Sequence, residues 1–403
     1  MPYVPKNQDS WLGQVKTANV GTKTIHSFES PASGSKIGLK QFLLLRVLWV
    51  KNQATKLSRS SEREKWNVTE QHIHVAREHL KAMSSWVQYK STISKNLAWH
   101  QNEEARIKPV VPSQGMLTLL HQHVQQKTRA PEGTSTRNDT SLGIGGLSID
   151  DDDESLETSD DDESPETEDY ISPFSPPTGD LGHAFKSISD EQIVNTALLL
   201  YLEALLINFV GIQADWTPER HALVVKRYNG QKVYEARLDG FLRYQRDQNN
   251  PIMAIVEVKP FSRDTDPDDS TRKQESAQMA AWICQHPPTP AELTSGSKFS
   301  RLLVSQDRHH IYLTFAEFDA GYVDYIRDTP PSPKLPTRLS KRPSTPPSQS
   351  SSAKPSFLKM NEYGPFETKN ESHMDSLGQI LLAFSLQACE IREKADSKAQ
   401  TQK

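Results

Sequence analysis

Residues 233–259, VYEARLDGFLRYQRDQNNPIMAIVEVK, decide the fold that we expect for this chain. Two apolar runs, 233–244 and 252–259, flank a polar loop, which is the pattern of two β-strands joined by a turn. If the strands pair in antiparallel fashion about Gln248, Asp239 lies opposite Glu257. Before them, 221–227 is a further candidate strand, and Asn229-Gly230 predicts a two-residue hairpin turn into 233–244.

The alternation of side chains along the two strands supports this register, because a slip of one residue would exchange the two faces. The face with Asp239 and Glu257 also carries Lys259, two residues beyond Glu257. The opposite face is almost wholly apolar and would hold Leu238, Gly240, Leu242, Tyr244, Ile252, Ala254, Val256 and Val258.

Two carboxylates and a lysine are therefore expected together on one sheet surface. Directly opposed residues have Cβ atoms roughly 4.5–5.5 Å apart, so the carboxylates of Asp239 and Glu257 could share one small cation. Mg²⁺ or Mn²⁺ at these two ligands would suit phosphodiester hydrolysis, with Lys259 positioning water or stabilising negative charge. An ordinary cross-strand ion-pair patch is the structural alternative for the three residues.

A helix is expected upstream of these strands. Ser189-Asp190-Glu191-Gln192 is a capping-box signal, and the apolar stretch 193–209 follows it. Glu203 lies on a mostly apolar face of this helix, where an unpaired carboxylate is costly. We expect Glu203 either to support the site or to reach solvent or an arginine at the helix edge.

These residues carry a resemblance to a known family. Asp239, the run Glu257-Val258-Lys259 and the upstream helix resemble the PD-(D/E)XK nuclease superfamily, most closely a fungal group of nuclease-like domains. The resemblance implies an α/β (α+β) fold with a restriction-endonuclease-like core, a mixed β-sheet flanked by helices in the order α-β-β-β-α-β. In that family the first Asp often follows a proline, whereas Leu238 precedes Asp239 here.

The resemblance covers 186–328 and 357–393 and extends to a helix that starts near Thr271. Gln274, Gln278 and Trp282 share one face of this helix at spacings of four, and the resemblance implies that Gln278 supports the site. It also implies Mg²⁺-dependent hydrolysis of DNA. A catalytically inactive nuclease fold that binds nucleic acid or protein is the alternative function.

The composition divides the chain into several regions. Only 35% of the 403 residues are hydrophobic and 26 are proline, so much of the chain is expected to lie outside a packed core. We expect a basic, partly helical region at 1–130, with helical patterns over 39–50 and 68–89, followed by an acidic Ser/Pro-rich disordered linker at 131–185. The nuclease-like core is expected at 186–328, and a disordered basic Pro/Ser-rich insert at 329–356 follows it. A strand and helix at 357–394 complete the domain, and 395–403 form a disordered tail.

Charge is distributed unevenly along the chain. The tract 150–169 holds 13 acidic residues and no basic ones, while 1–130 holds 19 Lys and Arg against 8 Asp and Glu. The basic region could attract nucleic-acid phosphates or be merely solvated, and the acidic tract could be a linker or the centre of a chromatin adaptor. Disordered flanks could also bind protein partners.

Two cysteines and the absence of a long apolar run limit the compartment. Cys284 and Cys389 cannot form a disulfide framework, and the longest apolar run, 42–50, is too short to cross a bilayer. We therefore expect no membrane partner and an intracellular location, nuclear or cytoplasmic. Arg263, Arg272 and Lys273 are expected to be solvated rather than to contact phosphate, and His309 and His310 to lie on the surface at a hairpin turn.

Overall fold

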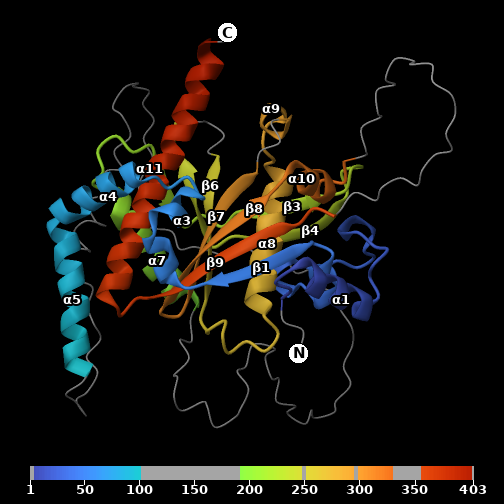
Figure 1. Cartoon of the computed structure of the whole chain (residues 1–403), viewed down its shortest axis with the longest axis horizontal. Helices are drawn as coiled ribbons and strands as arrows, with labels where there is room; N and C mark the ends of the chain where they lie inside the picture. Colours follow the sequence, from blue (N-terminus) through green and yellow to red (C-terminus); the bar gives the residue numbers. More distant parts are fainter. Residues whose placement is uncertain (1–3, 101–190, 247–250, 295–297, 330–354, 402–403) are drawn as a thin grey trace, which may run out of the picture. The chain divides into compact units, whose positions relative to one another are not determined.

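The computed structural model describes residues 4–100, 191–246, 251–294, 298–329 and 355–401. The expected linker at 131–185, with its acidic tract, lies outside these residues, as does 330–354 of the expected insert. The described part is a mixed α/β structure, as expected, with helices on both faces of a seven-stranded mixed sheet (Figure 1).

Helices and strands alternate along much of this structure. The α-helices are α1 (Gln8–Ala18), α2 (Leu39–Leu43), α3 (Ser60–Glu64), α4 (Glu70–Ala82), α5 (Ser84–His100), α7 (Glu191–Leu206), α8 (Ser270–Gln285), α9 (Pro290–Thr294), α10 (Ala320–Ile326) and α11 (Glu371–Thr401), with short 3-10 helices η1 (Ile25–Ser27), η2 (Gly34–Lys36) and η3 (Ala54–Ser58). The strands are β1 (Val47–Asn52), β2 (Ala214–Thr217), β3 (Ala222–Lys226), β4 (Lys232–Arg237), β5 (Gly240–Tyr244), β6 (Ile252–Lys259), β7 (Phe299–Asp307), β8 (His310–Phe318) and β9 (Leu358–Glu367).

The large sheet has the strand order β1-β9-β8-β7-β6-β5-β2. The pairs β1–β9 and β6–β7 are parallel, and the remaining neighbours are antiparallel. A parallel pair requires a crossover, and α8 lies in the crossover from β6 to β7. Because β6 and β7 run in the same direction, Lys259 at the end of β6 pairs with Asp307 at the end of β7.

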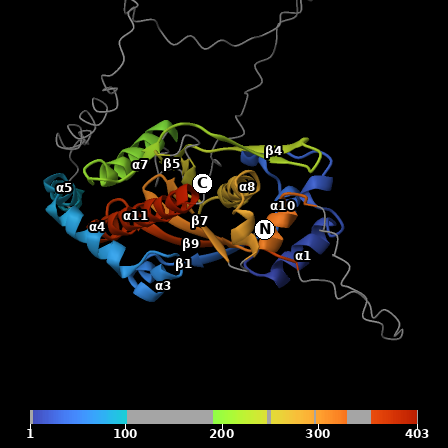
Figure 2. The ribbon, with the colours of Figure 1, turned by 90° about the horizontal axis from the view of Figure 1, so that it is seen from above.

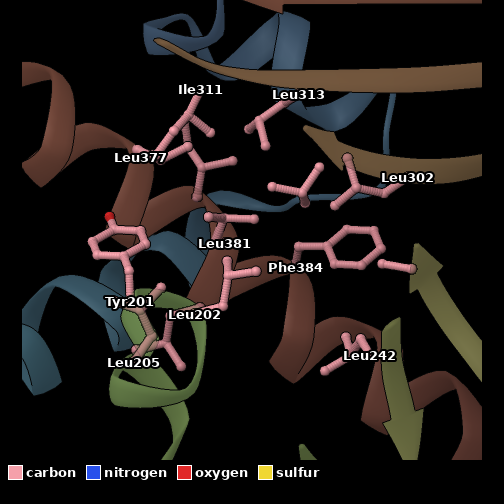
Figure 3. Packing of buried hydrophobic residues seen from close by; sticks show 14 of the residues in the cluster. Tyr201, Leu202, Leu205, Leu242, Leu302, Ile311, Leu313, Leu377, Leu381 and Phe384 are labelled. Atoms are coloured by element: carbon pink, nitrogen blue, oxygen red, sulfur yellow. The ribbon is translucent and has the colours of Figure 1, made fainter. Parts of the chain in front are cut away.

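Each face of the sheet is covered by its own apolar core. Side chains of α4, α7 and α11 pack on one face, and those of α1, α2, α8 and α10 pack on the other. Figure 2 shows α7 and α11 separated from α8 and α10. In the first core, Leu202 of α7 and Leu381 of α11 meet Leu302 and Leu313 of the sheet (Figure 3). Burial of these apolar faces is the main force that holds the helices to the sheet.

The expected register of β5 and β6 is confirmed. Asp239 directly precedes β5, and its backbone N donates to the carbonyl O of Val256 at 3.2 Å. This bond is offset by one residue from the strand register, which, continued one residue beyond the pair Gly240–Val256, sets Asp239 next to Glu257. The register continues through the pairs Gly240–Val256, Phe241–Ile255 and Leu242–Ala254.

The expected division of faces also holds along most of this pair. Leu242, Val256 and Val258 belong to the core under α7 and α11, as expected for one continuous face. The expected assignment is wrong for Leu238 and Ile252, which pack in the core around α8. A bulge between Leu242 and Arg243 shifts the register at Ile252, and Leu238 precedes the start of β5.

The segment 233–244, expected as one strand, forms two strands in different sheets. β4 ends at Arg237 and pairs with β3 in a separate two-stranded sheet. The expected two-residue turn at Asn229-Gly230 is wrong: Arg227 N donates to Gln231 O at 2.8 Å and Gly230 N to Arg227 O at 2.9 Å, so 228–230 form a three-residue loop in which Gly230 has a positive φ of 84° and Asn229 does not. β2, which lies at the sheet edge beside β5, was not predicted from the sequence. A Cβ at Gly240 would lie 2.8 Å from the carbonyl O of Thr217, so the close approach of β2 requires glycine at this position.

The N-terminal residues 4–100 are an integral part of the same structure. The prediction of one helix over 39–50 is wrong. α2 ends at Leu43, and the chain continues as the strand β1, which pairs in parallel with β9. Arg46 lies between them with a φ of 54°, a conformation that a helix does not contain. All described residues belong to one compact unit.

The expected C-terminal helix is confirmed as α11, whose buried residues lie between Met374 and Cys389. The helix continues to Thr401, through the segment 395–401 that was expected as part of a disordered tail. Within the ranges that the structure describes, no helix combines the length and the apolar character needed to cross a bilayer.

Candidate active site

Asp239 lies in the two-residue break between β4 and β5, and hydrogen bonds fix both its backbone and its side chain. Its carbonyl O accepts from Nδ2 of Asn195 in α7 at 3.2 Å. Its Oδ2 accepts from the backbone N of Val258 in β6 at 3.0 Å. The side chain is half-buried, and within the described ranges no hydrogen bond or ion pair reaches Oδ1. One oxygen of a rigidly held carboxylate is therefore open to a further ligand.

Glu257, opposite Asp239, is buried, with a relative exposure of 1%. Its Oε1 accepts from Nζ of Lys259 at 2.6 Å and from Nε2 of Gln274 at 2.5 Å. Its Oε2 accepts from Nε2 of Gln278. The two glutamines are one turn apart on α8, so this helix delivers two amide donors to one carboxylate. The carboxylate is thus oriented by three donors.

Lys259 joins Glu257 to a second carboxylate. Its Nζ lies 3.8 Å from Oε1 of Glu191 in the first turn of α7. The side chain of Lys259 is 12% exposed and that of Glu191 is 44% exposed, whereas Glu257 lies beneath them. Asp239, Lys259 and Glu191 therefore form the accessible side of the site, and Glu257 forms its base.

Burial and charge shift the pKa values of these groups in definite directions. Burial raises the pKa of Glu257 to about 8 and the nearby charge of Asp239 adds to the rise, although Lys259 and Gln278 oppose it. Burial alone would lower the pKa of Lys259, but Glu257, Glu191 and Asp239 outweigh it and raise this pKa. Lys259 therefore stays charged at neutral pH, while Glu257 holds a proton more readily than an exposed glutamate.

Burial also raises the pKa of Glu191, and the charge of Asp239 acts in the same direction, against Lys259 and Arg220. The charges of Asp239 and Lys259 therefore both act on Glu191. Three carboxyl groups thus surround the single ammonium group of Lys259.

Glu203 lies away from Asp239, Glu257, Lys259 and Glu191, so the structure does not place it where it could support the site as expected. Its Oε2 accepts from the backbone N of Trp216 in β2 at 2.9 Å. Glu203 is 12 residues beyond Glu191, which is about 18 Å along a helix axis. The carboxylate that α7 contributes to the site is Glu191, in its first turn. From the sequence, this residue was read only as part of a capping signal.

The helix expected to carry Gln278 does so, and Gln274 is the second residue of α8 at the site. Gln274 was expected on the face of Gln278, but the sequence analysis gave it no role. Gln278 also donates to the carbonyl O of Arg237 at 2.7 Å and so connects β4 to Glu257. Trp282 lies farther along α8 in the apolar core, where Arg301 covers its ring at 4.3 Å.

Arg263, Arg272 and Lys273 are buried rather than solvated, contrary to expectation, and none is exposed for phosphate contact. Arg263, in the loop after β6, contacts Asp307 at 2.6 Å, Glu275 at 2.8 Å and Glu362 at 2.8 Å. Arg272 binds both carboxylate oxygens of Glu362 at 3.0 Å. This buried ionic cluster connects α8, β7 and β9 directly behind the site.

The residues present fit Mg²⁺ in their chemistry. Mg²⁺ prefers oxygen ligands and commonly binds one or two carboxylates together with water and substrate phosphate. Asp239 offers an open Oδ1, and Oε1 of Gln278 is buried without a hydrogen-bond partner among the described residues. Over the same residues, no group of three or more His, Cys, Asp or Glu side chains is arranged to hold a metal. Asp239 and Glu257 are the carboxylates that we take as the candidate ligands.

Comparison of the chain with models of protein families, with curated proteins and with solved structures finds no match.

Proposed function

We propose that this protein is a PD-(D/E)XK nuclease-like enzyme that hydrolyses phosphodiester bonds of DNA with Mg²⁺. One observation carries the proposal: Asp239, Glu257 and Lys259 meet at adjoining ends of β5 and β6, with Gln274 and Gln278 of α8 directed at Glu257. An ordinary surface ion-pair patch would not place a glutamate with 1% exposure beneath three donors.

The order of elements supports this proposal. The run α7, β2, β5, β6, α8, β7 follows the order α-β-β-β-α-β when the β3–β4 hairpin and the short helix α9 are counted as insertions. In this run the Asp precedes the second strand, the Glu and Lys end the third strand, and the Gln lies on the following helix. These are the positions that the sequence resemblance implies.

The residues of the site have separable tasks in such a reaction. A Mg²⁺ ion held by Asp239 and Glu257 would polarise the phosphoryl oxygen and lower the pKa of an attacking water. Lys259 stabilises the negative charge that develops on the phosphate, and its pairing with Glu191 holds the ammonium group toward the accessible side. Gln274 and Gln278 fix the orientation of Glu257.

Asp239→Asn tests this proposal more cleanly than a substitution of Lys259. An asparagine keeps an oxygen that can accept from Val258 N, while it removes the charge and replaces Oδ1 with an NH2 group; Lys259→Ala would instead leave Glu257 buried without its cation. We expect Asp239→Asn to lower Mg²⁺-dependent cleavage at least about 100-fold, in the range expected when an electrostatic catalytic group is removed.

Asp324→Asn, an equal change at an exposed residue of α10, is the matched control and should cleave as the wild type does. Cleavage is measured on single-stranded, double-stranded and branched DNA, and folding is followed by circular dichroism. Equal activity of Asp239→Asn and wild type, or no wild-type cleavage of any substrate, would contradict the catalytic assignment.

A catalytically inactive scaffold that binds nucleic acid or protein is the second candidate, and one observation favours it. Both oxygens of Glu257 already accept hydrogen bonds from Lys259, Gln274 and Gln278, so an ion must displace or share these donors. Titration calorimetry with Mg²⁺ separates the candidates. The enzyme should bind Mg²⁺ in a manner that Asp239→Asn abolishes, whereas the scaffold should show no binding that depends on Asp239.

A further inference from the structure

The turn between β7 and β8 lies directly beside the candidate site. The backbone N of Arg308 donates to the carbonyl O of Lys259 at 3.0 Å. This bond extends the parallel pairing of β6 and β7 by one residue, so the turn begins where the strand that bears Glu257 and Lys259 ends. Any chain that crosses the site toward β8 must pass over this turn.

Residues after β9 add to the positive charge at this turn. The backbone N of Thr368 donates to the carbonyl O of His309 at 2.9 Å, which brings the neighbouring Lys369 to the turn. The rings of His309 and His310 lie 4.6 Å apart. We call Arg308, His309, His310 and Lys369 the β7–β8 turn cluster. Its first three members are half-buried, and Lys369 is exposed.

Two carboxylates, Asp307 and Glu367, lie next to the cluster in the described part of the chain. Asp307, which precedes the turn, directs both oxygens at Arg263 and is buried. Burial lowers the pKa of His309, and His310, Lys369 and Arg308 lower it further, while the exposed Glu367 acts in the opposite direction. Arg308 and Lys369 thus supply two permanent positive charges at this turn, and the exposed Glu367 supplies one negative charge.

We propose that the β7–β8 turn cluster binds a phosphate group of the nucleic-acid strand whose scissile phosphate lies at Asp239 and Glu257. This proposal rests on the proposed function. Two strand spacings separate β6 from β8, or roughly 10 Å. Each nucleotide of one strand advances about 3.4 Å along the helix axis while the backbone winds around it, so a phosphate at this distance lies within about three nucleotides of the scissile phosphate. The substrate would therefore be a polynucleotide that continues past the scissile bond rather than a mononucleotide.

Lys369→Gln tests the cluster because Lys369 is exposed and its loss should not affect folding. Binding of the full chain to a dye-labelled 20-base-pair duplex is measured by fluorescence anisotropy with Ca²⁺ in place of Mg²⁺. We expect Lys369→Gln to weaken binding about 5–10-fold at 0.1 M salt and to reduce the slope of log K against log salt by about one.

Lys81→Gln, the same change at an exposed residue of α4, is the matched control. It should leave both the affinity and the salt slope unchanged. Equal effects of the two substitutions would overturn the proposal.

A second measurement follows the His309 resonance by NMR across pH 5–8. An oligonucleotide at the cluster should raise the pKa of His309, because a phosphate favours the charged imidazole. Inorganic phosphate at the same phosphate concentration should raise it far less. A rise with inorganic phosphate and none with the oligonucleotide would overturn the assignment to a nucleic-acid strand.

Cleavage in Mg²⁺, measured separately, distinguishes failure of this inference from failure of the proposed function. If the wild type cleaves DNA and Lys369→Gln binds and cleaves it equally well, the cluster is rejected and the hydrolytic function remains in place. Weakened binding by Lys369→Gln in a wild type that cleaves nothing would support the cluster and reject hydrolysis.

Discussion

Glu257 is the residue at which burial and charge compete most directly. A carboxylate removed from water is unstable unless charge or hydrogen bonds compensate it, and Glu257 receives both from Lys259, Gln274 and Gln278. The compensation is incomplete, because the pKa of Glu257 is still about 8. A proton and a divalent cation would therefore compete for the same oxygens near neutral pH.

This raised pKa predicts how Glu257 affects stability. A carboxyl whose pKa is higher in the folded state than its model value of 4.5 stabilises the fold fully below pH 4.5, and that stabilisation is lost as the pH rises toward 8. Between pH 5 and 8, the free energy of unfolding of the wild type should fall by up to about 1.4 kcal/mol per pH unit as Glu257 ionises. Glu257→Gln cannot ionise at this position and should not show this fall.

Urea unfolding at pH 5, 6, 7 and 8 measures this slope. Glu64→Gln, at an exposed residue, is the control and should follow the wild type at every pH. A Glu257→Gln variant that parallels the wild type across the range would show that Glu257 is fully ionised in the folded protein.

Among the elements, α8 is held to the sheet by charge as well as by apolar packing. Arg263 contacts Glu275 of α8, Asp307 of β7 and Glu362 of β9, and its guanidinium lies 3.9 Å from the centre of the Tyr312 ring. Gln274 and Gln278 extend from the same helix to Glu257. The buried ionic cluster thus helps to set the position of the helix that orients the candidate metal ligand.

Arg263→Met tests this contribution because methionine keeps an apolar stem and removes the charge. Three buried carboxylates would lose their shared partner, which should lower the free energy of unfolding by about 3–5 kcal/mol. Arg237→Met is the matched control. The side chain of Arg237 is 76% exposed, so its loss should cost less than about 1 kcal/mol. Urea unfolding at pH 7 compares the two, and equal costs would contradict the assigned role.

The elements also show which features were predictable from sequence. The β5–β6 register was predictable because it depends only on alternation within 27 consecutive residues. The burial of Arg263 was not, because Asp307 and Glu362 lie 44 and 99 residues away. Likewise, the apolar pattern predicted the helix α7, but only its packing shows that its first turn, with Glu191, meets Lys259.

At the scale of the whole molecule, the N-terminal residues complete the sheet and cover α8. β1 pairs with β9 at the end of the sheet, and Nε1 of Trp49 in β1 donates to Oγ of Ser276 in α8 at 2.9 Å. Gly34 lies so close to β4 and α8 that a Cβ would be 2.7 Å from the Cβ of Ala236. The resemblance to nuclease domains excluded this region, yet it buries part of the helix that bears Gln274 and Gln278.

The fragment 187–403 should therefore not fold on its own. Without residues 1–124 it would expose β9 as an open edge and the apolar outer side of α8, which favours aggregation or a loosely packed state. We expect this fragment to bind the dye ANS and to unfold without a cooperative transition. Fragments 1–124 and 187–403, produced together, should copurify and unfold cooperatively, because together they form one compact unit.

Substitutions in the 1–124 fragment identify the contact that holds the two fragments together. Trp49→Ala removes a side chain with 2% exposure and should weaken their association by about 3–5 kcal/mol, whereas Leu12→Ala, at a residue with 48% exposure, should have little effect. Cooperative unfolding of 187–403 alone would contradict this account. It would mean that apolar packing of α7 and α11 on one face is enough to hold Glu257 and α8 in place, and that β1 is only an accessory to the sheet.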